Sequence, residues 1–191
     1  MKMSDEFIIR HCSPTLAGLK TGNLFNCPFR DKEELLLSIR SLNQRLVPKG
    51  VRVIPMKVFE QKVLLYIYRP AHLANDFAEK DIADLLKNCG YCIEKPGKCI
   101  VQLIRKICES NEFPHEIGLF LSYPPEDVTG FMRSPEEGCK CTGYWKVYGD
   151  EQKAKKIFAE YEKCTMLYCE QAAKGQSIEQ LTVVGERVPS F

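Results

Sequence analysis

The chain has 191 residues, of which 45% are hydrophobic and 27% are charged, with 27 Lys and Arg residues against 25 Asp and Glu residues. This length is sufficient for a buried core, and a formal net charge of +2 is too small to indicate binding to nucleic acid or to an anionic membrane. Ten cysteines exceed ordinary usage, but they fall short of the density that is typical of a small disulfide-stabilised scaffold.

The N-terminal segment lacks the features of an export signal. Asp5 and Glu6 stand where a secretory signal needs its apolar core. No apolar run approaches the ~20 residues that a membrane-spanning helix requires. We therefore expect a cytoplasmic protein in which the cysteines stay reduced, as small buried residues, metal ligands or reactive thiols.

The start of the chain carries two signals for the beginning of a helix. Ser4 before two acidic residues is typical of an N-cap, and so is Ser13 before Pro14, because proline fits the first helical position. Two glycines then interrupt the pattern. We expect residues 13–26 to form a short helix or a structured loop.

The clearest helix and the clearest strands come next. Residues 31–46 carry Leu and Ile at helical spacing after a capping aspartate, which predicts an amphipathic helix. Residues 51–59 and 62–69 are rich in Val, Ile, Leu and Tyr and are separated by two residues, which is the pattern of a β-hairpin.

The second half of the chain combines helices with two isolated strands. Helices are predicted over residues 70–77, 79–88, 98–109 and 150–173, with a further helix start at 124–127 and a short piece at 177–184. Residues 117–123 and 143–148 are short and rich in apolar or aromatic residues, which indicates strands. The sequence thus predicts an α+β fold, a small mainly antiparallel sheet packed with several helices, in a single globular domain over residues 1–191.

Three segments carry a family resemblance: HCSPTLAGLK at residues 11–20, FPHEIGLFLSYPPEDV at 113–128 and CKCTGYWKVYGD at 139–150. In these segments the chain resembles the uncharacterised bacterial domain-of-unknown-function family 3793. The resemblance implies a cytoplasmic bacterial protein. It implies no activity and no site residue, so the candidate sites rest on the residues alone.

The segment around Cys12 is the first candidate site. Cys12 precedes the predicted helix start at Ser13, where free backbone N–H groups and the positive end of the helix dipole favour a thiolate or a bound anion. His11 and Lys20 add potential positive charge. This loop is therefore a candidate for binding a small anionic ligand or for carrying a reactive thiol; a tightly packed capped turn is the alternative.

His115 is the second catalytic candidate beside Cys12. Adjacent residues of an extended chain point apart, so His115 or His72 would serve as the base for Cys12 rather than His11. His115 is also a candidate ligand of a small molecule, a metal or a haem. The alternative is a structural histidine at the edge of a strand.

The segment from Tyr144 to Tyr148 is aromatic and basic. Alternation along a strand would place Tyr144, Lys146 and Tyr148 on one face, with Trp145 and Val147 on the other. Tyr144 and Lys146 are candidate ligand-binding residues, because aromatic rings with lysine can stack on a planar cofactor such as flavin or on a base. In the alternative reading they cover the rim of a core that Trp145 and Val147 fill.

Four cysteines form a candidate zinc site: Cys89, Cys92, Cys139 and Cys141. Four thiolates are a common zinc ligand set, but the Cys-x-Cys spacing of the second pair matches the usual motifs poorly. A thioredoxin-like role for the first pair is disfavoured, because this pair follows the end of a helix rather than its start.

Three hypotheses for function follow from these residues. The first is a cytoplasmic protein that binds a thiol or a small anionic ligand at residues 11–20. The second is a non-catalytic protein that binds a metal or a cofactor, of a redox or iron-related kind, with zinc, haem or flavin as the candidate group. The third is a structural or interaction module without a site. No nucleic-acid or membrane partner is expected in any of them.

Overall fold

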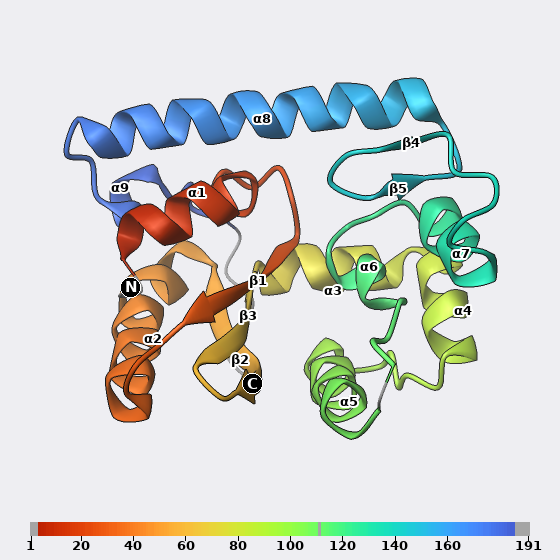
Figure 1. The fold of residues 1–191 in the computed structure, drawn as a ribbon, viewed down its shortest axis with the longest axis horizontal. Helices are drawn as coiled ribbons and strands as arrows, with labels where there is room; N and C mark the ends of the chain where they lie inside the picture. Colours follow the sequence, from red (N-terminus) through yellow and green to blue (C-terminus); the bar gives the residue numbers. More distant parts are fainter. Residues whose placement is uncertain (1–3, 111, 186–191) are drawn as a thin grey trace. The chain divides into compact units, whose positions relative to one another are not determined.

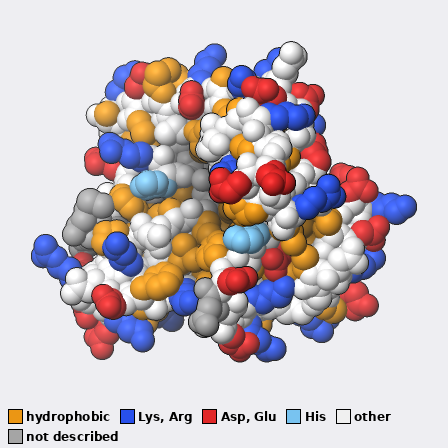
Figure 2. Space-filling view, turned by 45° about the vertical axis from the view of Figure 1, so that its right-hand side comes forward, with side chains coloured by type: hydrophobic (Ala, Val, Ile, Leu, Met, Phe, Trp, Pro, Cys, Tyr) orange, Lys and Arg blue, Asp and Glu red, His pale blue; other side chains and the backbone are white. Residues whose placement is uncertain are grey.

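The computed structural model describes residues 4–110 and 112–185 (Figure 1). Helices predominate beside two small antiparallel sheets, which confirms the predicted α+β class. Side chains of both charge signs are interspersed over the face drawn in Figure 2, in keeping with the balanced composition. Within the described residues, no helix combines the length and the apolar character needed to cross a membrane.

The chain divides into two compact units. Unit 1 comprises residues 1–73 and 163–191, and unit 2 comprises residues 74–162. Two helices span the boundaries between them, α3 (Pro70–Ala78) and α8 (Glu151–Ala173). This division does not test the expected single domain, which stays a prediction.

Unit 1 begins with one continuous helix, α1 (Asp5–Leu16). The Ser4 side chain accepts a hydrogen bond from a backbone amide of the first turn, as its capping role predicts. The second helix start predicted at Ser13 is wrong, because Pro14 lies inside α1. The Ser13 hydroxyl donates to the Ile9 carbonyl one turn earlier, as serines within helices often do.

The main sheet of unit 1 has three antiparallel strands, β1 (Gly22–Pro28), β2 (Arg52–Phe59) and β3 (Lys62–Tyr68), in the order β1-β3-β2. The predicted hairpin of β2 and β3 is confirmed. The register of β2 shifts between Pro55 and Lys57, where a proline in an edge strand interrupts the ladder.

Strand β1 was not predicted, since residues 13–26 were expected to form a short helix or a loop. Gly22, two asparagines and Pro28 are poor strand formers, so the local sequence does not favour a strand. The strand exists because it pairs along its whole length with β3, for example with Phe25 opposite Leu65. Tertiary pairing here overrides local propensity.

The helices α2 (Lys32–Leu46) and α9 (Ile178–Leu181) complete unit 1, with a short 3-10 helix, η1 (Val47–Lys49), after α2. Asp31 caps α2 and Ser177 caps α9, both through their side chains. These helices, α1 and the sheet share one core. Its buried members include Ile8, Ile9, Leu16, Leu35, Ile39, Leu42, Leu46, Val63, Leu65, Ile67, Ile178 and Leu181.

Unit 2 is mainly helical, with α4 (Lys80–Asn88), α5 (Pro96–Glu109) and α7 (Pro125–Arg133) where helices were predicted. The strand predicted over residues 117–123 is wrong. Its first half forms a short helix, α6 (Ile117–Phe120). A short buried apolar run fits either structure, because both leave no polar face.

A tight turn ends α6 and explains why no strand forms. Ser122 has a positive φ of 55°, and the amide of Tyr123 donates to the carbonyl of Gly118. A Cβ atom at Gly118 would lie 2.7 Å from a Val128 side-chain atom, so this position needs glycine. The close approach brings α6 against the start of α7.

The second sheet is a small hairpin of β4 (Cys141–Thr142) and β5 (Lys146–Val147). The strand predicted over residues 143–148 is thus shorter than expected and lies in this hairpin rather than in the main sheet. Its alternation is confirmed over residues 145–147, since Trp145 and Val147 are buried while Lys146 is partly exposed, but Tyr144 packs against the same cluster as Trp145. Both buried side chains pack on the first part of α8.

Candidate ligand-binding site

Cys12 lies in the last turn of α1, so the helix-start environment predicted for it is wrong. Its side chain is 0% exposed. Burial raises the pKa of the Cys12 thiol far above its usual value, although the charge of Lys20 acts in the opposite direction. A buried, protonated thiol is usually unreactive. The burial of Cys12 therefore disfavours it as a nucleophile, and its reactivity stays a prediction.

The end of α1 also disfavours the anion site predicted at residues 11–20. The amides of Leu19 and Lys20 both donate to the Pro14 carbonyl, at 2.9 and 3.2 Å, so they are not available to an anion. The C-terminal end of a helix is the negative end of its dipole. Lys20 itself is buried, and desolvation lowers its pKa to about 8.

The carbonyl groups at this helix end are held by Arg69, whose side chain is buried. Its Nε donates to the Thr15 carbonyl at 2.7 Å, and its Nη2 donates to the carbonyls of Leu16 and Val183 at 2.6 and 2.8 Å. The guanidinium thus joins the end of α1 to the segment that follows α9. This is a structural role. The ligand site predicted at residues 11–20 stays a prediction without support from these contacts.

We expect Cys12 to be alkylated by iodoacetamide far more slowly than the exposed Cys92 and Cys108. Its raised pKa leaves almost no thiolate at neutral pH, and its burial denies access to the reagent. Timed alkylation followed by peptide mass spectrometry measures the three rates, with Cys92 and Cys108 as internal controls. Faster labelling of Cys12 would contradict its buried placement.

His11 belongs to a cluster of aromatic rings in unit 1. Its imidazole stacks on the ring of Phe25, with centroids 5.3 Å apart and planes inclined by 5°, and it lies 4.5 Å from the ring of Phe7. Desolvation, assisted by the charge of Arg10, lowers the pKa of His11. These contacts favour a neutral packing residue.

The predicted site residues are divided between the two units. Unit 1 contains His11, Cys12, Ser13 and Lys20. Unit 2 contains His115, Tyr144 and Lys146. Convergence of the two groups on one cleft stays a prediction. Within unit 2, the structure brings His115 and Lys146 to the same cavity.

This cavity has a volume of about 250 Å³, and we call it the Trp145 pocket. Its walls come from the segment before α6, from α6, from α7 and from the β4–β5 hairpin. Its aromatic lining consists of Phe113, Tyr123, Phe131 and Trp145. Its ionisable lining consists of His115, Asp127 and Lys146. A mostly apolar cavity with a few polar groups is the usual form of a small-molecule site.

His115 and Lys146 both contact Phe131 in the wall of the pocket. The imidazole of His115 meets the Phe131 ring edge to face, with centroids 4.9 Å apart and planes at 77°. The Lys146 ammonium lies 5.8 Å from the centroid of the same ring. One aromatic side chain therefore positions the two basic groups at the same pocket.

Asp127 is the acidic residue of the lining, and it is only 3% exposed. Its Oδ2 accepts from the indole Nε1 of Trp145 at 2.7 Å. Its Oδ1 accepts from the backbone amides of Tyr148 and Gly149, each at 2.7 Å. Three donors occupy this carboxylate, so Asp127 acts as an anchor for the β4–β5 hairpin rather than as a base.

Trp145 connects the pocket to an aromatic core. Its ring stacks on Tyr123, with centroids 4.9 Å apart, and meets Phe158 edge to face at 4.5 Å. Tyr144, predicted to bind a ligand, packs instead on Phe158 and Tyr161, at 5.7 and 5.3 Å. It is not among the lining residues of the Trp145 pocket.

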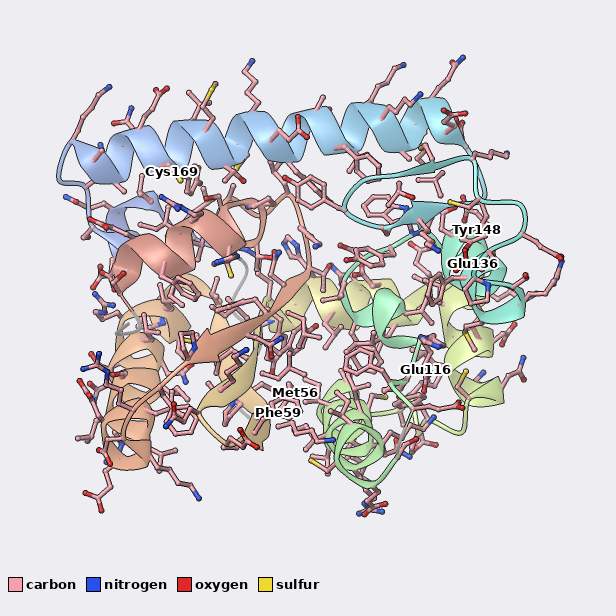
Figure 3. The ribbon with its side chains drawn as sticks, viewed as in Figure 1. Met56, Phe59, Glu116, Glu136, Tyr148 and Cys169 are labelled. Carbon is pink, nitrogen blue, oxygen red and sulfur yellow. The ribbon has the colours of Figure 1, made fainter. Side chains whose placement is uncertain are left out.

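A partly buried ion pair holds the segment that carries His115. Glu116, labelled in Figure 3, accepts from the Lys106 ammonium at 2.7 Å and from the Tyr91 hydroxyl at 3.0 Å. Lys106 also donates to the carbonyl of Cys89 at 2.8 Å. Burial acts to raise the pKa of Glu116, but the hydrogen bond from Lys106 and its other partners lower it below its usual value.

The four cysteines of the predicted zinc site all belong to unit 2. Cys89 follows the last residue of α4, as predicted, and burial raises its pKa, which disfavours a thioredoxin-like role. The Cys139 thiol donates to the carbonyl of Cys141 at 3.4 Å. In the described parts of the chain, no three His, Cys, Asp or Glu side chains gather in a metal-binding arrangement. The zinc site stays a hypothesis without support from this geometry.

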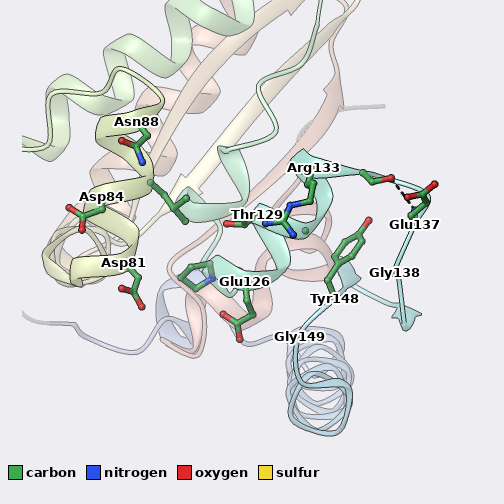
Figure 4. Close-up of a pocket in the computed structure, with 14 residues that line it drawn as sticks. Asp81, Asp84, Asn88, Glu126, Thr129, Arg133, Glu137, Gly138, Tyr148 and Gly149 are labelled. Atoms are coloured by element: carbon green, nitrogen blue, oxygen red, sulfur yellow. Dashed lines mark hydrogen bonds between the residues drawn. The ribbon is translucent and has the colours of Figure 1, made fainter.

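A wider hollow of about 820 Å³ lies on unit 2, where α4 approaches α7 (Figure 4). Its acidic lining residues are Asp81, Asp84, Glu126 and Glu137, all of them exposed to solvent. Arg133 lies among them. Exposed charges are well solvated and make weak contacts, so the Trp145 pocket is the better candidate site.

A family model described as "Protein of unknown function (DUF3793)" matches residues 8–182 of the chain. The chain belongs to this family. The DUF3793 match confirms the resemblance seen in the three sequence segments, and it covers all of unit 2 with the Trp145 pocket. The comparisons with curated proteins and with solved structures each gave no match. The function of this DUF3793 protein must therefore be argued from its own residues.

Of the residues that line the pocket, only His115 and Lys146 were predicted as site residues, and the others, among them Phe113, Asp127 and Phe131, were missed. Phe131 lies in α7 and would pass for an ordinary core residue, and Asp127 resembles the acid of a helix start. Phe113 precedes a proline and carries no pattern of its own. The only available signal was the presence of Phe113 and Asp127 in the same family segment as His115.

Proposed function

We propose that this protein binds a small planar organic ligand in the Trp145 pocket. The observation that carries this proposal is that four aromatic side chains line one cavity, those of Phe113, Tyr123, Phe131 and Trp145. Aromatic walls attract flat, apolar molecules through ring contacts and apolar burial. Two basic side chains beside them supply the few polar contacts that orient a ligand.

The size of the pocket limits the ligand. Sites for drug-sized molecules run from ~300 to ~1,000 Å³. A cavity of about 250 Å³ accepts a smaller molecule, such as a single or fused aromatic ring with one substituent. Complete enclosure of a cofactor as large as flavin mononucleotide is disfavoured by this volume.

The other functions considered from the sequence have less support. A reactive thiol at Cys12 conflicts with its full burial. A metal-binding or iron-related role lacks a ligand cluster among the residues described. A module without a site is the competing reading of unit 2, and the absence of any ligand binding would favour it.

The experiment uses the single tryptophan of the chain. Because Trp145 is the single tryptophan, a spectrum of the ¹⁵N-labelled protein contains one indole N–H resonance. This resonance reports on the pocket, since Trp145 lines it. Titration with neutral 2-naphthamide is expected to shift this resonance in a saturable manner. Absence of a saturable shift for 2-naphthamide and also for the smaller benzamide would overturn the proposal.

A matched pair of variants assigns the binding to this pocket. Phe113→Ala removes one aromatic wall and is expected to weaken 2-naphthamide binding by about 2- to 10-fold, since an aromatic contact contributes ~0.5–1.5 kcal/mol. Phe59→Ala is the control, because Phe59 has a similar exposed fraction, 41% against 44%, but lies in unit 1. Equal binding by both variants would place the ligand elsewhere.

A further inference from the structure

We infer that the ligand of the Trp145 pocket is an anion, with a carboxylate or a similar acidic group bound between Lys146 and His115. This inference rests on the proposed function and deepens it, because it names the chemical class of the ligand. Two observations support it. The two basic side chains have N–H groups that can still donate to a ligand, and the acid beside them, Asp127, already accepts hydrogen bonds from three donors.

The Lys146 ammonium retains a donor for a ligand. It donates to the Pro135 carbonyl at 2.9 Å and pairs with Glu136 at 3.3 Å. An ammonium has three N–H groups, and within residues 4–110 and 112–185 the structure gives the third one no acceptor. Lys146 is only partly exposed, so a carboxylate that reached it would be partly shielded from water.

The pairing of Lys146 with Glu136 is weak enough for a ligand to replace. The Glu136 side chain is 88% exposed, and exposed ion pairs contribute little to stability. The Tyr148 hydroxyl also donates to the Pro135 carbonyl, at 2.9 Å, and Figure 3 shows the labelled Tyr148 and Glu136 close together. Lys146 is therefore held at the pocket mainly by a backbone carbonyl, while its charge stays available.

His115 adds a second donor on the same wall. Its imidazole contacts Phe131, and in the part of the chain that the structure describes it makes no hydrogen bond or ion pair. A neutral imidazole carries one N–H donor, and a protonated one carries two. Both forms can donate to a ligand oxygen beside the Lys146 ammonium.

Asp127 does not make the pocket selective for cations. Three of its about four lone-pair sites are taken, by the indole of Trp145 and by the amides of Tyr148 and Gly149. Asp127 is only 3% exposed and already accepts from three donors, whereas the Lys146 ammonium is partly exposed and has an N–H group to offer. The polar contacts that remain available are thus donors, which select an anionic acceptor.

The test compares two probes of the same shape. 2-Naphthoate and 2-naphthamide differ by a carboxylate in place of a neutral amide, and both are titrated against the Trp145 indole resonance. The carboxylate is expected to bind about tenfold more tightly, as one charge-assisted hydrogen bond at a partly exposed site would give. Equal binding would overturn the anion inference while the proposed function stands, and binding of neither probe would overturn both.

Two lysine variants make the result specific. Lys146→Met keeps an unbranched side chain of similar length. It is expected to cost 2-naphthoate about tenfold in affinity and to cost 2-naphthamide clearly less, because the amide oxygen is a neutral acceptor. Lys153→Met removes an exposed lysine of the same unit and is expected to change neither affinity. A retained preference for the carboxylate in Lys146→Met would overturn the inference, and saturable binding of 2-naphthamide to this variant shows that the pocket is intact.

Discussion

Replacement of Arg69 by methionine is expected to lower the free energy of unfolding of unit 1 by about 3–4 kcal/mol. The buried guanidinium donates to three backbone carbonyls, at Thr15, Leu16 and Val183. Methionine has a similar length but no donor, so carbonyls at the end of α1 would be left buried without this partner. Loss of several hydrogen bonds to one charged group is among the most destabilising single changes in a protein interior.

Hydrogen exchange followed by mass spectrometry measures this effect unit by unit. The protection of amides in α1 and β3 should fall about a hundredfold to a thousandfold, because ~1.4 kcal/mol corresponds to a factor of ten. Arg40→Met is the matched control, since Arg40 is exposed on α2 of the same unit. Protection in Arg69→Met equal to that of the control would show that the guanidinium does not hold the end of α1.

Replacement of Asp127 by asparagine is expected to destabilise unit 2 by about 2–4 kcal/mol. The oxygen of the new amide can still accept from the backbone amides of Tyr148 and Gly149. The NH₂ group of the asparagine would then face the indole N–H of Trp145. Two donors in contact leave both unsatisfied in a buried site. The β4–β5 hairpin should loosen and the Trp145 pocket with it.

Urea unfolding followed by tryptophan fluorescence reports on unit 2 alone, because Trp145 is the only tryptophan of the chain. Glu126→Gln provides the control, since it makes the same change at the adjacent, exposed position. Trp145→Phe removes the indole donor and should reduce the cost of Asp127→Asn when the two are combined. Because this change also removes the only tryptophan, the variants of this cycle are compared by hydrogen exchange of the unit 2 amides. Additive costs in the double variant would contradict the proposed contact.

The helices were the most predictable part of this fold. Residues 31–46 and 150–173 carry their own capping residues and apolar spacing, so the local sequence suffices. Strand β1 could not be predicted, since only its pairing with β3 makes it a strand. The prediction of a strand at α6 was wrong for a different reason. A buried apolar run without a polar face shows neither helical nor strand periodicity, so the sequence pattern does not distinguish the two.

The candidate site was only partly predictable from sequence. His115 and Lys146 were found from their chemistry, and the structure places both on the ring of Phe131. Cys12 was misjudged because the prediction depended on a helix start at Ser13, and helix ends determine the local charge environment. A single error in an element boundary thus reversed the expected state of the thiol.

The discontinuity of unit 1 has a consequence for synthesis on the ribosome. Unit 2 is one uninterrupted stretch, residues 74–162, whereas unit 1 needs the C-terminal residues to bury Ile178 and Leu181 and to give Arg69 its bond to Val183. Because the chain emerges from its N-terminus, the first unit to begin is the last that can be completed. The nascent chain must therefore carry the partly exposed apolar faces of α1 and the main sheet until Ile178, Leu181 and Val183 have emerged, and this interval is when chaperones would be expected to act on it.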